Sequence, residues 1–256
     1  MDIVRVRNVV IGNGRPKICV PIVSVTQEEI LEDAGELLEL PVDIAEWRAD
    51  WYEDVGDLSK VLDTAKRLRE RLGDIPLLFT FRTAKEGGEK SLETEDYVAL
   101  NKAAAESGFV DMLDVELFTG DREVMSLIEF AHRHQVRVIV SSHDFRKTPS
   151  RETILGRLRK MQELGADIPK IAVMPQIKND VLALLAATVE MSEQYARVPI
   201  ITMSMAGTGV VSRLAGETFG SAVTYGSAGK QSAPGQVAVE ELSRILNLIH
   251  DCQENG

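Results

Sequence analysis

The sequence is poor in cysteine and contains no long apolar run, and each absence excludes a class of protein. Its two cysteines, Cys19 and Cys252, lie at opposite ends of the chain and form no Cys-x-x-Cys pair. A disulfide framework and a cysteine zinc site are therefore excluded, and a reducing compartment is indicated. No apolar run approaches the roughly 20 residues that cross a bilayer, and the first residues do not follow the pattern of a signal peptide. We expect a soluble, cytoplasmic protein without a membrane partner.

Positive charge is outnumbered by negative charge, with 29 Lys and Arg against 40 Asp and Glu, and the 256 residues carry a formal net charge of −11 at pH 7. A chain this acidic repels a phosphate backbone, so we expect no nucleic-acid partner. The content of 44% hydrophobic and 27% charged residues is typical of a globular protein and argues against disorder. The length matches the roughly 250 residues of a single eight-stranded barrel, although two small domains would also fit.

Apolar segments rich in β-forming residues alternate with amphipathic helical patterns along the whole chain. The expected strands are 17–23, 43–50, 76–82, 109–117, 137–145, 168–175, 198–205 and 222–228. The expected helices are 26–40, 58–72, 95–107, 121–134, 151–165, 179–195 and 235–251, with a short helix at 209–216. The first helix opens with the capping-box pattern Thr26-x-x-Glu29.

Eight βα units follow one another without a flexible linker, and no Gly-x-Gly-x-x-Gly motif follows the first of them. The sequence therefore predicts an α/β fold, a single (β/α)8 TIM barrel spanning residues 1–256, rather than an open doubly wound sheet. Residues 1–16 precede the first unit and contain two short β-like segments around the turn from Gly12 to Gly14. We predict that this hairpin closes the N-terminal mouth of the barrel.

Polar and charged residues gather near the ends of several expected strands. They are Glu46 with Arg48, Arg82 with Glu86 in the following loop, Asp114 with Glu116, and Ser141 with His143. Residues two apart on a strand face the same side, and the outer face of a barrel is covered by helices. A set of such residues on successive strands therefore indicates a site at the C-terminal ends, where barrel enzymes place their chemistry.

Lys170 is a cation within an expected buried strand, among Ile168, Ile171, Val173 and Met174. Burial in such surroundings would lower its pKa and free the amine as a nucleophile that can form a Schiff base with a carbonyl. The alternative is that Lys170 follows Pro169 at the start of the strand, in water. If Ala172 lies above Lys170 on the same side, the long side chain has room to rise toward the site.

His143 is the one histidine of four that falls at an expected strand end. An imidazole can take up and return a proton near neutral pH, so His143 is a candidate acid and base. A structural, hydrogen-bonded histidine is the alternative.

Two later features suit an anionic ligand. Arg213 lies in the expected short helix and can hold a carboxylate or phosphate through two hydrogen bonds, although a surface ion pair would explain it as well. The small, polar loop 226–235 ends at the start of a helix, and such a loop can close over an anion. Plain flexibility would explain its composition equally well.

Together these residues resemble one known family, type I 3-dehydroquinate dehydratase, over nearly the whole chain. The motifs that carry the resemblance are Glu46-Trp-Arg48, Phe79-Thr-Phe-Arg82 with Glu86, Ser142-His143-Asp144-Phe145, Lys170 before Ile-Ala-Val-Met-Pro, Ser212-Arg213, and Ser232-Ala-Pro-Gly-Gln236. The resemblance implies a shikimate-pathway lyase that acts on the small molecule 3-dehydroquinate, needs no cofactor or metal, and forms a homodimer.

The resemblance also implies roles for single residues. Lys170 would form an imine with the C3 ketone of 3-dehydroquinate, and His143 would remove the C2 proton and then protonate the departing hydroxyl. Glu86 would orient His143, and Arg213 would hold the substrate carboxylate. The remaining binding residues would be Glu46, Arg48, Arg82, Ser232 and Gln236.

The sequence departs from the family pattern at three positions. Pro21 stands where many members have a serine that contacts the substrate, Tyr225 where phenylalanine is common, and Gly207 where some members have lysine. Tyr225 would make the pocket more polar. Two other functions stay open at this point, a class I aldolase that uses the same lysine chemistry and a barrel that binds a sugar acid without catalysis.

Overall fold

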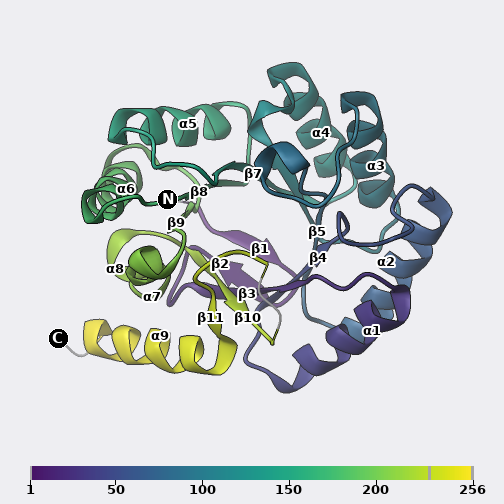
Figure 1. The fold of residues 1–256 in the computed structure, drawn as a ribbon, viewed down its shortest axis with the longest axis horizontal. Coiled ribbons are helices and arrows are strands. Elements are labelled where there is room, and N and C mark those ends of the chain that lie inside the picture. Colours follow the sequence, from purple (N-terminus) through teal and green to yellow (C-terminus); the bar gives the residue numbers. More distant parts are fainter. Residues whose placement is uncertain (1, 230–231, 255–256) are drawn as a thin grey trace.

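The computed structural model describes residues 2–229 and 232–254. Parallel strands follow one another around a central barrel, and helices form the layer outside it (Figure 1). The barrel strands are β3 (Lys17–Ile22), β4 (Ile44–Arg48), β5 (Leu77–Thr80), β6 (Met112–Glu116), β7 (Arg137–Asp144), β8 (Ile168–Val173), β9 (Ile201–Ser204) and β10 (Val223–Ser227). Each lies within one of the eight expected segments, and the predicted TIM barrel is confirmed.

The barrel closes between β9 and β10 through few contacts. Ile200 and Ser221 form an isolated parallel bridge just before these strands. The amide of Ala222 donates to the carbonyl of Ile200 at 2.8 Å, and the amide of Thr202 donates to Ser221 Oγ at 3.0 Å. A serine hydroxyl thus replaces a backbone partner where the strands are too short to pair fully.

The helices cover the outer face of the barrel (Figure 1). They are α1 (Gln27–Glu36), α2 (Leu58–Leu72), α3 (Thr94–Glu106), α4 (Asp121–Arg133), α5 (Arg151–Glu163), α6 (Lys178–Glu190), α7 (Val210–Leu214), α8 (Gly216–Phe219) and α9 (Val239–Glu254). The predicted capping box of α1 is confirmed, because Thr26 Oγ1 accepts from the Glu29 amide and Glu29 accepts from the Thr26 amide.

The largest differences from the expected helix ranges are at the ends of three helices. The segment 26–40 leaves the α-helix after Glu36 and continues as the 3-10 turn η1 (Leu37–Glu39), and 179–195 ends in the π-turn η4 (Met191–Tyr195). The segment 235–251 begins its helix only at Val239, because β11 (Val237–Ala238) first pairs in parallel with β10. A strand of two residues is too short to show an alternating pattern in the sequence.

The N-terminal hairpin turns earlier than predicted. It consists of β1 (Val4–Val6) and β2 (Val9–Ile11), so the turn is at Arg7 and Asn8, and the prediction that it lies at Gly12 to Gly14 is wrong. Arg7 takes a φ of 51°, which is uncommon for a residue with a side chain. Its guanidinium is held by Asp111 at 2.6 Å, a contact that fixes the turn against the barrel.

The hairpin covers the bottom of the barrel, as predicted. Val4, Val6 and Ile11 are buried in one cluster with the lowest layer of inward-facing side chains. That layer is Cys19, Ile44, Leu78, Met112, Ile139, Ile168, Ile201 and Val223. The barrel is therefore closed by hydrocarbon at its N-terminal end, and polar interior side chains lie above this layer, toward the C-terminal end.

The alternation along each strand decides which side chains face inward. On β4, Ala45 and Trp47 belong to the cluster between barrel and helices, and Trp47 packs edge-on to Phe79 at 5.5 Å between ring centroids. Glu46 and Arg48 take the opposite parity and face the interior. No helix within residues 2–229 and 232–254 is both long enough and apolar enough to cross a membrane.

Candidate active site

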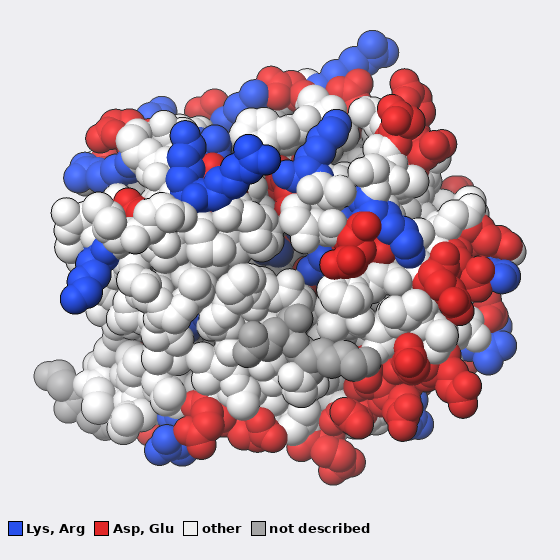
Figure 2. Space-filling view, in the orientation of Figure 1, with Lys and Arg blue, Asp and Glu red and all other residues white. Residues whose placement is uncertain are grey.

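One pocket at the C-terminal end of the barrel is lined by all nine residues to which the sequence assigned a catalytic or binding role, but not by Asp114, Glu116 and Ser141, the other polar residues expected at strand ends. The nine are Glu46, Arg48, Arg82, Glu86, His143, Lys170, Arg213, Ser232 and Gln236. Figure 2 shows cationic side chains at the bottom of a hollow on this face. The structure therefore brings together residues that lie up to 190 positions apart, from 46 to 236 in the sequence.

Lys170 faces the interior from β8 and is only 3% exposed, which excludes a lysine in water. Its Nζ lies 2.9 Å from Asp114 Oδ2, 2.9 Å from Tyr225 Oη and 3.9 Å from Glu46 Oε1. The expectation that Lys170 has purely apolar surroundings is therefore wrong. Ile171 and Val173 point away from it, into the cluster between the barrel and the helices. Ala172 lines the pocket on the same side as Lys170.

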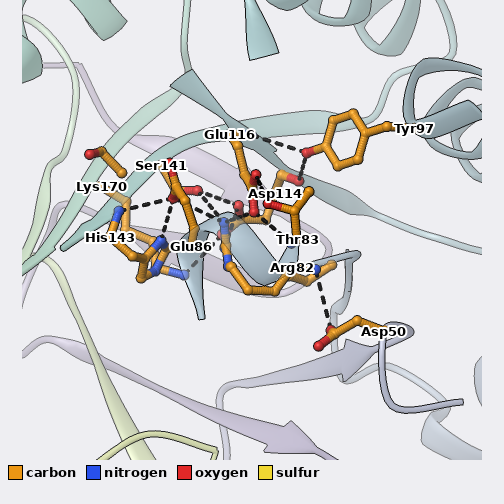
Figure 3. A network of polar contacts seen from close by, with 12 residues as sticks. Asp50, Arg82, Thr83, Glu86, Tyr97, Asp114, Glu116, Ser141, His143 and Lys170 are labelled. Carbon is orange, nitrogen blue, oxygen red and sulfur yellow. Dashed lines mark hydrogen bonds and ion pairs between the residues drawn. The ribbon is translucent and has the colours of Figure 1, made fainter. Parts of the chain in front are cut away.

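Asp114 and Arg82 form a buried ionic centre that reaches the pocket through Arg82 (Figure 3). Arg82 Nη2 donates to Asp114 at 2.7 Å, and its Nη1 lies 3.0 Å from both Glu116 Oε1 and Ser141 Oγ. Burial alone would raise the pKa of Asp114, but the cationic Arg82 and Lys170 outweigh it and hold that pKa well below the usual range. Asp114 therefore stays ionised beside the Lys170 amine.

His143 is fixed by Glu86. Glu86 Oε2 accepts from the backbone amide of His143 at 2.9 Å and lies 3.0 Å from His143 Nδ1. Nδ1 is occupied by this contact, which leaves Nε2 as the ring nitrogen for a ligand in the pocket. Burial, followed by the charges of Arg82 and Lys170, lowers the pKa of His143 well below its ordinary value. Burial also raises the pKa of Glu86 to about 8.

The lowered pKa of His143 predicts an observable order of titration. In an NMR pH titration, the His143 ring should change charge below pH 6.5, because burial and two cations disfavour its protonated form. His250 is an internal control in the same spectrum, since its hydrogen bond to Glu217 raises its pKa. The His143 signal is assigned by its loss in His143→Ala. A midpoint for His143 above that of His250 would contradict this electrostatic account.

Arg213 lies under the loop that follows β10. It is 1% exposed, so a surface ion pair is excluded, and within the described part of the chain no carboxylate forms an ion pair with it. Its Nη2 donates to the carbonyl of Pro234 at 3.3 Å. Burial lowers its pKa to about 10, so Arg213 remains a cation at neutral pH. A buried cation without a counter-ion is suited to an anionic ligand.

Ser232 and Gln236 hold each other across the loop. The Ser232 amide donates to Gln236 Oε1 at 2.8 Å, and Gln236 Nε2 donates to Ser232 Oγ at 3.0 Å. The amide of Ala206 donates to the Pro234 carbonyl, which ties this segment to the end of β9. The loop 226–235 nominated from the sequence includes residues 230 and 231, which lie outside the described residues.

Asp50 was not nominated from the sequence, although it shares the parity of Glu46 and Arg48. It is fully buried, and its two oxygens accept from Arg48 Nε and Nη2 at 2.8 Å each. The same carboxylate accepts from the backbone amides of Arg82 and Glu89. Asp50 therefore fixes the direction of Arg48 and anchors the loop that carries Glu86.

We expect Asp50→Asn to lower kcat/KM about tenfold, mainly through a higher KM, because an amide cannot replace both charged hydrogen bonds to Arg48. Stability should fall by about 1–3 kcal/mol, since Arg48 loses its buried partner. Steady-state kinetics and thermal melting measure the two effects. Asp54→Asn is the control, because Asp54 is a partly exposed partner of Lys60 in the same segment. Wild-type KM in Asp50→Asn would show that Arg48 needs no such support.

Within the described ranges, no three or more histidine, cysteine, aspartate or glutamate side chains cluster in a way that could hold a metal ion. Most charged side chains in the pocket instead form ion pairs with other side chains. Arg213 forms none within the described residues and can bind an anionic ligand. The arrangement supplies a buried amine, a neutral imidazole and a cationic anchor within one enclosed space. Such a set suits covalent and acid–base chemistry on a small anionic carbonyl compound.

Comparison with known proteins gives the family. The family model for type I 3-dehydroquinase matches residues 18–253. The chain belongs to the type I 3-dehydroquinase family. It is 58% identical over 250 residues to the 3-dehydroquinate dehydratase of Salmonella agona, covering 98% of this chain and 99% of the relative. It is 55% identical over 248 residues to that of Bacillus licheniformis, covering 97% and 98%.

Solved structures of this family have the same fold. The type I 3-dehydroquinate dehydratase from Clostridium difficile superposes with a TM-score of 0.96 at 53% identity, covering 98% of this chain and 99% of that one. The 3-dehydroquinate dehydratase from Geobacillus kaustophilus gives 0.95 at 39% identity, covering 98% and 97%. The resemblance inferred from the motifs is confirmed, and so is the enzyme class, a hydro-lyase of the shikimate pathway.

Proposed function

We propose that this chain converts 3-dehydroquinate to 3-dehydroshikimate and water by syn elimination through a Schiff base on Lys170. This reaction would be the third step of chorismate biosynthesis, which leads to the aromatic amino acids. The observation that carries the proposal is the buried Lys170 amine, which lines the same pocket as His143 and the unpaired Arg213. A homodimer and a cytoplasmic location stay predictions.

The first step is imine formation. Nζ of Lys170 attacks the C3 carbonyl of the substrate, and the carbonyl oxygen leaves as water once it has taken up two protons. Starting from the ammonium form, Lys170 passes one proton to the carbonyl oxygen as its freed lone pair attacks C3, and the carbinolamine nitrogen gives up the second, so the step balances without another reagent. The product is an iminium cation, and the Asp114 carboxylate at 2.9 Å from Nζ stabilises its charge.

The second step is the elimination. His143 removes the C2 proton, and the electron pair of that bond moves toward the iminium nitrogen to give an enamine. The protonated imidazole then gives its proton to the C1 hydroxyl on the same side, which leaves as water. One residue that takes and returns the proton accounts for syn geometry. Glu86 keeps the ring in place through Nδ1 and the backbone amide. Hydrolysis of the conjugated imine releases the product and restores Lys170.

The remaining side chains would hold the substrate. Arg213 would bind the carboxylate, because it is a buried cation with which no carboxylate of residues 2–229 and 232–254 forms an ion pair. Glu46, Arg48, Arg82, Ser232 and Gln236 would contact the hydroxyl groups and exclude water from the pocket. Arg82 already makes three contacts to Asp114, Glu116 and Ser141. Its contribution would therefore be mainly a fixed positive charge near the reacting atoms.

A relative supports covalent chemistry in this family. The structure from Clostridium difficile, 53% identical to this chain, is described as containing covalently modified comenic acid. We propose that the amine which reacts in this chain is that of Lys170.

The experiment that tests the proposed reaction is ultraviolet absorbance on mixing with 3-dehydroquinate. The conjugated product absorbs where the substrate does not, so the signal should rise catalytically. A class I aldolase would cleave a carbon–carbon bond and give no such signal, and a sugar-acid binder would leave the absorbance unchanged. Absence of the rise with active-site-intact protein would refute the proposed reaction.

A further inference from the structure

The hydroxyl of Tyr225 contacts the reacting amine, but the mechanism above gives it no task. Tyr225 lies on β10, and its Oη is 2.9 Å from Lys170 Nζ. The side chain is 4% exposed and lies in the same buried cluster as Cys19 of β3. Tyr225 is therefore held between two neighbouring strands, with its polar end directed at the amine.

Lys170 is thus held from two sides by groups of different chemistry. Asp114 on β6 supplies a carboxylate, which only accepts hydrogen bonds while it is ionised. Tyr225 on β10 supplies a hydroxyl, which accepts one hydrogen bond and donates another. An ammonium has three N–H bonds and can satisfy both partners, whereas an iminium nitrogen keeps only one. The amine therefore loses donors during the reaction, and one of its two partners must change role.

The hydroxyl is the partner that can change role. In the carbinolamine that precedes the imine, the departing oxygen is bonded to the same carbon as Nζ. A hydroxyl that reaches Nζ therefore lies within reach of this oxygen as well. Burial raises the pKa of Tyr225 well above its ordinary value, so the group stays a neutral hydroxyl and forms no stable tyrosinate.

We propose that Tyr225 is a further catalytic residue, which relays a proton from Lys170 Nζ to the carbonyl-derived oxygen during imine formation; this rests on the proposed Schiff-base function. The carbinolamine oxygen already carries one hydrogen and its nitrogen is still protonated, so Oη accepts a hydrogen from this nitrogen while its own hydrogen passes to the oxygen as the second one. The C3–O bond then breaks, the oxygen leaves as water with the electron pair of that bond, and the nitrogen lone pair forms the C=N bond. The tyrosine is unchanged at the end, and the elimination by His143 proceeds without it.

The variant Tyr225→Phe tests the relay, because it removes the hydroxyl and keeps the ring. Borohydride quenching at successive times after mixing with 3-dehydroquinate measures how fast the imine forms. We expect at least a tenfold lower rate of adduct formation. With substrate deuterated at C2, the kinetic isotope effect on turnover should fall toward 1, since imine formation would become slower than proton removal.

The matched control is Thr224→Val, which removes a buried hydroxyl one residue earlier on the same strand. Thr224 does not line the pocket, and its Oγ1 has no hydrogen-bond partner among the described residues. Both variants should melt near the wild-type temperature, and Thr224→Val should form adduct at the wild-type rate. Tyr225→His, which keeps a hydrogen-bonding ring, should form adduct faster than Tyr225→Phe.

Three results would overturn the relay. The first is a wild-type rate of adduct formation in Tyr225→Phe. The second is slower turnover in that variant with an unchanged isotope effect, which would mean that the hydroxyl serves packing alone. The third is the absence of any adduct in the wild-type protein, which would remove the Schiff base itself. Only the third also refutes the proposed function, so the two failures are distinguishable.

Discussion

Lys170→Met should reduce turnover of 3-dehydroquinate by about 10⁵-fold or more, because it removes the only group proposed to form a covalent bond with the substrate. Methionine is similar in length and fills the same space without an amine. Arg82 still lies 2.7 Å from Asp114 in such a variant, so the carboxylate keeps a buried partner. The loss should therefore be chemical rather than a failure to fold, and ultraviolet turnover together with thermal melting measures both.

Lys160→Met is the control for this variant. Lys160 is an exposed partner of Asp121 on the outer helix layer, so its replacement should leave turnover at the wild-type level. Retention of more than about 1% of wild-type turnover in Lys170→Met would contradict the covalent mechanism, because acid–base catalysis alone would then account for the reaction.

His143→Ala should produce the second large effect and a different pattern. Turnover should fall by about 10²- to 10⁴-fold, the range attributed to a positioned acid and base. Imine formation should continue, since Lys170 keeps its contacts with Asp114 and Tyr225. The adduct should therefore accumulate after mixing with 3-dehydroquinate. Borohydride reduction and protein mass spectrometry measure the accumulated adduct, and ultraviolet absorbance measures the residual turnover.

The control for the histidine is His132→Ala, whose ring lies on the surface beside Asp167. We expect wild-type turnover in this variant. A folded His143→Ala protein that neither turns over substrate nor forms an adduct would contradict the separate roles of Lys170 and His143.

The barrel was predictable because its signal is local and repeated. Each strand and helix shows its own period, and eight successive units leave few alternative topologies. The site was predictable for a related reason, since residues such as Glu46 and Arg48 share the parity that faces the interior. Strand ends of a closed barrel meet at one rim, so polar residues at those ends predicted where the pocket lies. Ser232 and Gln236, which follow the last barrel strand, were assigned to it only through the family resemblance.

Contacts between distant strands could not be read in the same way. The sequence places Lys170 among apolar neighbours, but its actual partners are Asp114 and Tyr225, 56 and 55 positions away. The shear of the barrel decides which inward side chains share a layer, and no local pattern records it. Asp50 was missed although its parity matched, because its task, holding Arg48 and a loop from β5, also depends on this layering.

The hairpin shows the limit of turn signals. Glycine and asparagine favour tight turns, so the Gly12 to Gly14 segment was the expected site. The chain instead turns at Arg7, because burial of Val4, Val6 and Ile11 against the barrel fixes the register and Asp111 holds the arginine. Packing of three apolar side chains outweighs the local preference of the turn residues.

The most direct test of the imine is the mass of the protein after borohydride reduction in the presence of 3-dehydroquinate. A Schiff base predicts one covalent adduct per chain, located by peptide mapping on the side chain at position 170. An unmodified protein that still turns over its substrate, or an adduct on a different lysine, would contradict the account.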